Sequence, residues 1–388
     1  MEIICCRSSD EIARKAFRLR YKVYGTEMAY YDDAIDHQNE LYVDRFDPAA
    51  RIYVAIRDDQ AIATCRALYD RDFDFSNDLP EVLSSALEIP KFLSSQAGSL
   101  ALSTKFAISS SHRGSLAAHL VTAKMFENLI EDNIHFVFSA CAPHLYDFYS
   151  QLGFHLYAPT FSDDSGLWAP IVLATRDWAH LRDVRSPLYR YLERKKLCQS
   201  THPSVKWFYE NYGSSIKSLL PKVDDDVLER VLADGGQSRS DQEVQEGGLF
   251  SGMTTEDVRK IIGSGRILKF AGGDAIIWTA QIQDEMFIVL SGEILERRLD
   301  GELPSSNIYP GQVIGEVAML TSKMRATDCI AISDAELVAL SRQSLVKLMK
   351  GNPDLASRLL FNLARLQSHK LLQANQDMIR LYMDFYDR

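Results

Sequence analysis

An acidic and a basic side chain in the C-terminal third of the chain have the spacing of a small-ligand site. Glu316 stands nine residues ahead of Arg325. A carboxylate accepts a hydrogen bond from a sugar hydroxyl, whereas a guanidinium presents a planar fork of donors that suits a phosphate. Gly311 and Gly315 let the backbone approach a ligand, and residues 315–320 predict a short helical turn whose free N–H groups can face an anion. The pattern favours a ligand with both a hydroxyl and a phosphate, which a cyclic nucleotide provides.

The stretch from Gly311 to Thr327 resembles the phosphate-binding cassette of cyclic-nucleotide-binding domains. The residues that match, and that the resemblance makes nucleotide-binding residues, are Gly315, Glu316, Val317, Ala318, Arg325, Ala326 and Thr327. The flanks are similar too, with an expected leading helix at 249–261 and a strand pair at 273–294. The resemblance implies cAMP as the allosteric ligand. It favours cGMP less, because Ala326 lacks the hydroxyl that guanine-preferring relatives often carry there.

One position departs from this resemblance, since the family's Gly-Asp before the second strand is Ala280-Gln281 here. The alternative is a β-roll that has kept its shape and lost its ligand. Burying Glu316 and Arg325 without partners would be costly, which favours a working site.

The amino-acid composition limits the number of domains, the partners and the cellular compartment that fit this chain. The length of 388 residues fits two domains, and 46% hydrophobic with 25% charged residues is typical of a globular protein. A net charge of −10 leaves no basic face for nucleic acid. We expect no transmembrane segment, no signal peptide and no metal site. The six scattered cysteines form no disulfide or zinc framework, so a reducing cytoplasm is expected.

Hydrophobic periodicity in the first half predicts alternating helices and strands. The expected helices are 10–24, 115–133 and 144–152, and the expected strands are 51–56, 61–69, 99–108, 135–140 and 166–174. The region 70–98 is expected to be mostly loop with short helical pieces.

This order of elements resembles the fold of GNAT acyltransferases. Tyr149, Gly153 and Phe154 match that family's Tyr-x-x-x-Gly-Phe ending, and Arg113-Gly114 opens the long helix where the family has its pyrophosphate loop. The expected fold class is therefore α/β (α+β): a GNAT-like N-terminal domain, followed by a C-terminal β-roll with helices.

A narrower resemblance is to the autoinducer-synthase and long-chain N-acyl amino acid synthase branch. The residues that carry it are Arg20, Val23, Tyr24, Asp44, Phe46, Asp47, Arg66, Lys105 and Phe106. Leu102 stands where that branch has an acid, so the general base is unassigned, with Glu40 and His112 as weak candidates.

The resemblance implies roles for three groups of residues in N-acyl transfer. The catalytic group is Tyr149, as acid for the leaving thiolate, with the backbone of Phe106, Ala107 and Ile108 as the oxyanion hole. The acyl-donor group is Lys105, Arg113, Gly114, Ser115, Leu116 and Ala117. The acceptor-side group is Arg20, Glu27, Asp44, Asp47 and Arg66. Because the donor loop is poor in glycine, an acyl-carrier-protein (acyl-ACP) donor is favoured over acyl-CoA.

Each of these assignments has a structural alternative. The donor loop could be an ordinary helix start, Tyr149 a core aromatic, and the acceptor-side charges surface salt bridges. Glu27 also belongs to an acidic stretch with Asp32, Asp33 and Asp36, and such a run is usually a solvated face.

The expected domains are an acyltransferase domain at 1–190, a partly helical linker at 191–246, and a nucleotide-binding domain with C-terminal helices at 247–388. The first hypothesis is a cyclic-nucleotide-regulated N-acyltransferase that acts on a small amine such as an amino acid. The second is a cAMP sensor whose acyltransferase-like half is a non-catalytic binding module. The third is a protein-lysine acetyltransferase that uses acetyl-CoA.

Overall fold

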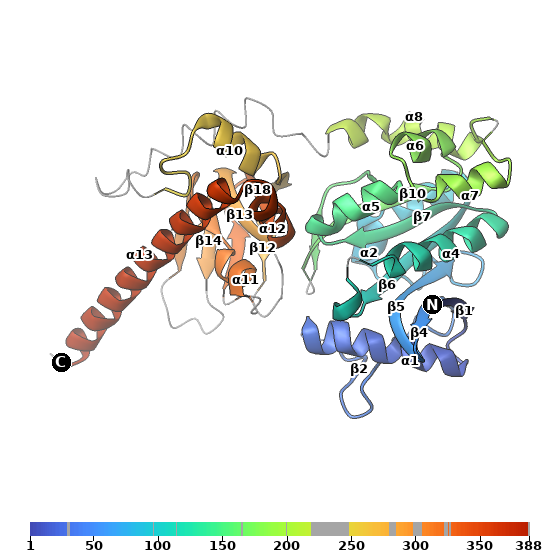
Figure 1. Ribbon diagram of the computed structural model, residues 1–388, viewed down its shortest axis with the longest axis horizontal. Helices are drawn as coiled ribbons and strands as arrows, with labels where there is room; N and C mark the ends of the chain where they lie inside the picture. The colour runs from blue at the N-terminus through green and yellow to red at the C-terminus, as the bar shows by residue number, and fades with distance from the viewer. Residues whose placement is uncertain are drawn as a thin grey trace. The chain divides into compact units, whose positions relative to one another are not determined.

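The computed structural model describes residues 1–28, 32–95, 97–113, 115–163, 166–198, 200–218, 248–278, 285–297, 305–321, 325 and 327–386. The chain divides into two compact units, Met1–Leu220 and Pro221–Arg388 (Figure 1). Helix α8 (Pro203–Ser218), which the sequence places in the linker, packs on the first unit through Val205, Phe208 and Tyr212. The first unit therefore extends beyond residue 190, and most of the predicted linker lies outside the described residues.

An eight-stranded sheet organises the first unit, in the order β1-β4-β5-β6-β7-β10-β8, with β9 paired to β10. The strands are β1 Glu2–Cys6, β4 Arg51–Arg57, β5 Gln60–Tyr69, β6 Ser99–Ile108, β7 Ile134–Cys141, β8 His155–Leu156, β9 Phe161–Asp163 and β10 Gly166–Ala174. Among the described strands of this sheet, only the central pair, β6 and β7, is parallel. Two short strands, β2 (Ile35–Asp36) and β3 (Leu41–Tyr42), form a separate hairpin.

Helices surround this sheet. They are α1 Glu11–Arg20, α2 Glu81–Ala86, α3 Ile89–Ser95, α4 Ala117–Glu131, α5 Tyr146–Leu152, α6 Trp178–Asp183, α7 Tyr189–Arg194 and α8. The expected helix at 10–24 changes character after Arg20 and continues as a π-helix, Tyr21–Glu27. Such wide turns often occur at functional sites.

The sheet is buried on both faces, which explains its nearly continuous apolar strands. Ala101 and Val137 pack in one core with Val121 and Met125 of α4. Their neighbours on the strands, including Leu100 and Phe136, face the opposite core with Phe92 of α3 and Phe208 of α8. Successive side chains of a strand point to opposite faces, so one strand serves both cores.

Strands β6 and β7 separate where the predicted catalytic residues lie. Their pairing runs from Ser99 to Leu102 within the described residues, although β6 continues to Ile108. Against β5, strand β6 carries one extra residue near Lys105, whose φ is +53°. A left-handed lysine in a bulge is strained, and bulges often re-aim side chains beside sites.

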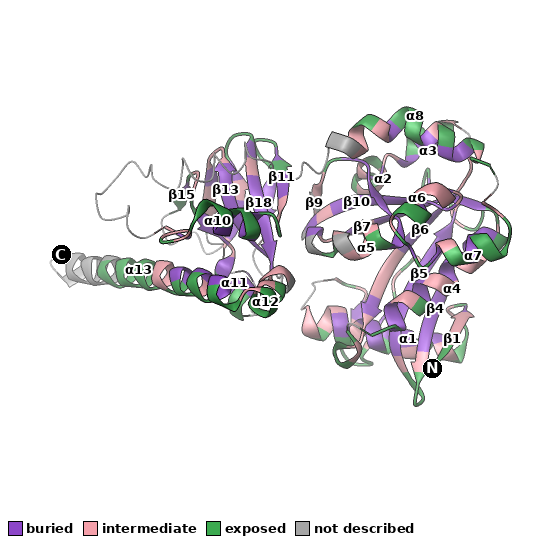
Figure 2. Ribbon diagram, turned by 45° about the horizontal axis from the view of Figure 1, so that its top comes forward, coloured by how far each residue is buried: buried purple, intermediate pink, exposed green. Residues whose placement is uncertain are grey.

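The second unit is a β-roll of two four-stranded sheets, β11-β18-β13-β16 and β12-β17-β14-β15. The strands are β11 Arg266–Phe270, β12 Ala275–Ile277, β13 Glu285–Ser291, β14 Ile294–Arg297, β15 Ser306–Ile308, β16 Val313–Ile314, β17 Asp328–Ala331 and β18 Ala335–Ser341. The helices are α10 Thr255–Ile262, α11 Glu316–Thr321, α12 Arg342–Gly351 and α13 Pro353–Tyr386. Figure 2 shows the buried strands of each unit and the exposed positions along α13.

The predicted fold class is confirmed, with a mixed α/β unit followed by a β-roll with helices. The short helical turn expected at 315–320 is α11, and α13 is one continuous helix of 34 residues. Among the described residues, no helix combines the length and apolarity needed to span a bilayer.

Candidate functional site

Four of the predicted acceptor-side residues meet in one buried ion cluster. Arg20, at the end of α1, donates from Nη1 to Asp47 Oδ1 over 2.7 Å, and Asp47 is fully buried. Arg66 on β5 lies 3.1 Å from the same oxygen and also donates to Asp44. Its Nε donates to Thr104 Oγ1 over 2.7 Å. These pairs are buried within the unit and are not the surface salt bridges of the alternative.

Lys105 extends this cluster toward the β2–β3 hairpin. Its ammonium contacts the hydroxyl of Tyr42, which in turn donates to Asp32, and it lies 3.6 Å from Asp44 Oδ2. Burial, opposed by the charge of Asp44 and reinforced by Arg66, lowers the pKa of Lys105 to about 8. Burial would raise the pKa of Asp44, but its hydrogen bond to Arg66 prevails and lowers it.

The charges of this cluster balance. The cations are Arg20, Arg66 and Lys105, and the carboxylates are Asp32, Asp44 and Asp47. Nε and Nη2 of Arg20 are buried and have no hydrogen-bond partner among the described residues. Removing one member of such a set leaves an uncompensated buried charge, which is strongly destabilising.

Glu27 lies apart from the other acceptor-side residues. Its carboxylate pairs with Arg113, which the sequence assigned to the acyl donor. The structure therefore joins one predicted acceptor-side residue to one predicted donor residue, linking the π-helix to the loop ahead of α4.

Arg113, Ser115 and Leu116 were expected to form the first turn of the long helix, but they precede it. Helix α4 begins at Ala117, and Arg113 has an extended backbone with ψ of 137°. Ser115 Oγ accepts from the N–H of Ala117 over 3.3 Å, and Leu116 is exposed. Gly114 lies outside the described residues. Arg113, Ser115 and Leu116 therefore lie ahead of the helix, and Leu116 is an exposed apolar residue there.

Phe106, Ala107 and Ile108 occupy β6 beyond its separation from β7. The carbonyl of Phe106 accepts from Tyr24 Oη over 2.8 Å. The ring of Phe106 stacks on Phe148 with centroids 5.8 Å apart and meets Tyr149 edge-on at 6.3 Å. The predicted oxyanion stretch and the predicted acid are thus neighbours.

Tyr149 on α5 is half-buried among aromatic rings, with Phe154 at a centroid distance of 5.4 Å. Its hydroxyl makes no hydrogen bond to another described residue. Burial raises the pKa of Tyr149 well above its usual value, so the phenol stays protonated at neutral pH. A core role for the ring and a proton-donor role for the hydroxyl are compatible here.

In the second unit, Arg325 lies against the start of α11. Its Nη1 donates to the carbonyl of Gly315 over 2.5 Å, and its Nη2 donates to the carbonyl of Glu285 over 2.6 Å. Gly315 has φ of +78°, and a Cβ there would meet Nη1 of Arg325 at 2.3 Å. Only glycine fits this position without displacing the guanidinium.

Glu316 is buried beneath the C-terminal helix. Its Oε1 accepts from Gln367 Nε2 over 2.5 Å and from Lys370 Nζ over 2.8 Å, both from α13. These two partners were not predicted from the sequence. They lie 51 and 54 residues after Glu316 in the sequence, so no local pattern indicates the contact.

The remaining cassette residues vary in exposure. Val317 is exposed and Ala318 is buried, while Thr327 Oγ1 donates to Glu296 Oε1 over 2.8 Å. Ala326 lies outside the described residues, as do Ala280 and Gln281. Arg342, which was not singled out from the sequence, donates to the carbonyls of Met319 and Ala318 over 2.6 and 3.2 Å. These hydrogen bonds join α11 to the start of α12.

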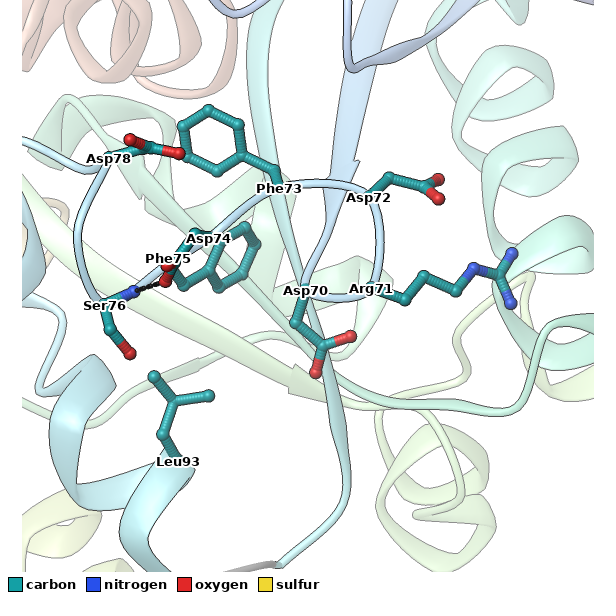
Figure 3. Close-up of a pocket in the computed structure, with 9 residues that line it drawn as sticks. All are labelled: Asp70, Arg71, Asp72, Phe73, Asp74, Phe75, Ser76, Asp78 and Leu93. Carbon is teal, nitrogen blue, oxygen red and sulfur yellow. Dashed lines mark hydrogen bonds between the residues drawn. The ribbon is translucent and has the colours of Figure 1, made fainter.

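A surface hollow of about 480 Å³ lies in the first unit (Figure 3). It is lined by the acidic loop at 70–78 and Leu93. Its carboxylates point in different directions, and Asp74 accepts from the N–H of Ser76 over 2.9 Å (Figure 3). Within the described ranges, no group of three or more histidine, cysteine, aspartate or glutamate side chains could hold a metal ion.

Comparison with known families assigns each unit to a class. Residues 15–177 match the family model of the N-acyl amino acid synthase FeeM. Residues 267–352 match the model of the cyclic nucleotide-binding domain. The chain thus joins an acyltransferase-like synthase domain to a cyclic-nucleotide-binding domain.

Particular relatives match mainly the second unit. The cyclic AMP receptor protein of Thermus thermophilus is 26% identical over 133 residues, which is 34% of this chain and 60% of that protein. The cAMP-dependent protein kinase regulatory subunit of Aspergillus fumigatus is 27% identical over 145 residues, 37% of this chain and 35% of that protein. The chain therefore spans about 60% and 35% of the length of these two relatives.

A solved structure of a CoA-dependent acyl-homoserine lactone synthase, with SAM and isopentyl-CoA, is also similar. It is 11% identical, with coverage of 48% of this chain and 90% of that chain and a TM-score of 0.38.

Proposed function

We propose that the protein is an N-acyltransferase that moves an acyl group from a thioester to a small amine, under the control of a cyclic nucleotide. The observation that carries this proposal is the match of residues 15–177 to a synthase family, together with the balanced ion cluster beside the separated end of β6. We also propose that the transfer follows GNAT-type chemistry and that the acceptor is an amino acid.

The thioester carbonyl would lie against the backbone of Phe106 to Ile108, on the side where the pairing with β7 has ended, and N–H groups there would stabilise the developing oxyanion. The acceptor ammonium first loses one proton to a base, and the free amine then attacks the carbonyl carbon. The C–S bond breaks, and Tyr149 donates its proton to the leaving thiolate. The resulting phenolate recovers a proton from the amide nitrogen, so the net product is an amide, a thiol and one proton.

Lys105 fits the role of the base that the sequence leaves unassigned. With a pKa of about 8, roughly a tenth of its side chains are neutral at pH 7. Its contact with Tyr42 and the contact of Tyr42 with Asp32 offer the proton a path to the half-exposed Asp32 carboxylate. Leu102 itself is buried in an apolar core and takes no part.

The loop from Arg113 to Leu116 would hold the donor. Its exposed Leu116 and its paired Arg113 suit a surface partner, which supports acyl-ACP as the donor over acyl-CoA. For the regulatory ligand, similarity to a cyclic AMP receptor protein and to cAMP-dependent kinase regulatory subunits supports cAMP over cGMP.

The test incubates the full chain with acyl-ACP or acyl-CoA of several lengths and a pool of amines, with and without cAMP, and detects amides by mass spectrometry. We expect N-acyl product that falls about a hundredfold in Tyr149→Phe and changes with cAMP. The dependence on cAMP should be lost in Arg325→Ala. Donor binding without turnover would instead favour the non-catalytic module, and a preference for acetyl-CoA with protein lysines would favour the acetyltransferase.

A further inference from the structure

The contact between α13 and Glu316 occupies the cyclic-nucleotide site with the chain's own side chains. Gln367 and Lys370 lie one helical turn apart on α13, and both donate to Oε1 of Glu316. Lys370 also reaches the carbonyl of Val313 at 3.4 Å. A ribose hydroxyl would need the same carboxylate as its acceptor.

The burial of the two ligand-binding side chains shows that this state is closed. The side chain of Glu316 is 4% exposed, and Arg325 is 3% exposed. Arg325 already donates to the carbonyls of Gly315 and Glu285. A sugar-phosphate cannot reach a carboxylate at this burial unless the covering turn of α13 moves.

The anchoring of α13 shows which part can move. Its first half belongs to the core, with Leu355, Leu359 and Leu363 buried. Asn362 Nδ2 also donates to the carbonyls of Leu249 and Ser251, each at 2.9 Å. After Lys370 the contacts weaken, since Leu371 and Leu372 are 62% and 59% exposed. Among the described side chains of α13, those that contact Glu316 and Val313 are therefore the last to make a hydrogen bond to the β-roll.

We propose that Gln367 and Lys370 form a plug that competes with the cyclic nucleotide for Glu316. Binding of the nucleotide displaces both side chains and frees α13 beyond the buried leucines. This inference rests on the proposed function, because it assumes that the second unit binds a cyclic nucleotide. It adds the sign of the coupling, in which a docked α13 opposes the ligand and a bound ligand opposes docking.

A role of Lys370 in binding the ligand, instead of excluding it, would have the opposite effect on affinity. If the ammonium of Lys370 contacted the bound cyclic phosphate, its removal would weaken binding. If Lys370 belongs to a plug, its removal strengthens binding, because the ligand no longer displaces it. The two roles predict changes of opposite sign.

The experiment measures cAMP and cGMP affinity by calorimetry on the full chain, for wild type, Lys370→Met and Gln367→Ala/Lys370→Met. Lys347→Met is the matched control, since Lys347 is an exposed lysine on the neighbouring α12. We expect Lys370→Met to bind cAMP about three- to tenfold more tightly, because the lost ion pair is half-exposed. The double variant should bind more tightly still, and the control should match wild type.

Hydrogen exchange of residues 367–376 gives a second measurement that does not depend on affinity. In wild type, saturating cAMP should speed exchange there, and in Lys370→Met exchange should already be fast without ligand. Unchanged or weaker affinity in Lys370→Met, or slower exchange on ligand binding, overturns the plug while leaving the nucleotide site intact. If neither wild type nor either plug variant binds a cyclic nucleotide, the proposed nucleotide site itself is wrong.

Discussion

The two units bury their charged residues in different ways. In the first unit, three cations and three carboxylates from α1, two strands and the loops ahead of β4 pair with one another. In the second unit, Glu316 depends on two side chains of a single helix. A cluster held from several elements resists opening, whereas a contact from a single helix can be exchanged for a ligand. We therefore expect the site in the first unit to be fixed and the site in the second unit to be switchable.

The strongest test of the fixed cluster is Asp47→Ala. Asp47 is fully buried and faces both Arg20 and Arg66, so its loss leaves two guanidinium groups short of a carboxylate. We expect the first unit to lose about 3–5 kcal/mol of unfolding free energy in urea titrations. Asp33→Ala, an exposed carboxylate nearby, is the control and should change little. A small effect at Asp47 would show that the cluster is not fixed.

Gly315→Ala tests whether the close approach of Gly315 to Arg325 is needed for stability and for nucleotide binding in the second unit. The new methyl group would lie 2.3 Å from Nη1 of Arg325, at a φ that disfavours alanine. We expect a stability loss of about 1–3 kcal/mol and loss of cyclic-nucleotide binding, measured by thermal melting and calorimetry. Gly351→Ala is the control, because no atom lies within 4 Å of its Cβ position. Normal binding in Gly315→Ala would separate this glycine from the site.

The pH dependence of turnover tests Lys105 as the base. Because burial lowers its pKa to about 8, the neutral amine accumulates as pH rises through 8, and activity should rise with it. Lys105→Arg keeps the charge but cannot accept the proton. It should lower kcat/KM about tenfold or more and remove this limb of the pH profile. Lys124→Arg on α4 is the control. A profile unchanged by Lys105→Arg would assign the base elsewhere.

Helix α8 packs on the rest of the first unit, and we expect the stability of this contact to depend weakly on pH. Tyr209 of α8 donates to Asp177 over 2.7 Å and lies beside His155, whose ring stacks near His180. Burial, reinforced by His155, lowers the pKa of His180. The unfolded chain therefore binds more protons below about pH 6.5, and folding stability falls as pH decreases.

His180→Gln should flatten this acid dependence by an amount on the order of 1 kcal/mol. Thermal melts of the first unit between pH 5 and pH 7 measure it, with the exposed His37→Gln as control. An equally steep acid loss in His180→Gln would place the responsible group elsewhere.

Much of the architecture could be predicted because its signals are local. The strand alternation at 99–108 and the helical spacing at 115–133 indicate their own elements, and the Gly315-Glu316 to Arg325 spacing indicates its cassette. The π-helix after Arg20, the bulge at Lys105 and the true start of α4 were not predicted. Each depends on packing against strands that are distant in the chain.

The amino-acid sequence alone determined the class of each half and supplied the candidate residues for each site, since residue type and short-range spacing carry that information. Only the tertiary structure decided which charges meet. It placed Tyr42 and Asp32 on Lys105, paired Glu27 with Arg113, and laid Gln367 and Lys370 over Glu316. Such pairs form between segments far apart in the chain, where burial and geometry select the partner and no local pattern records the choice.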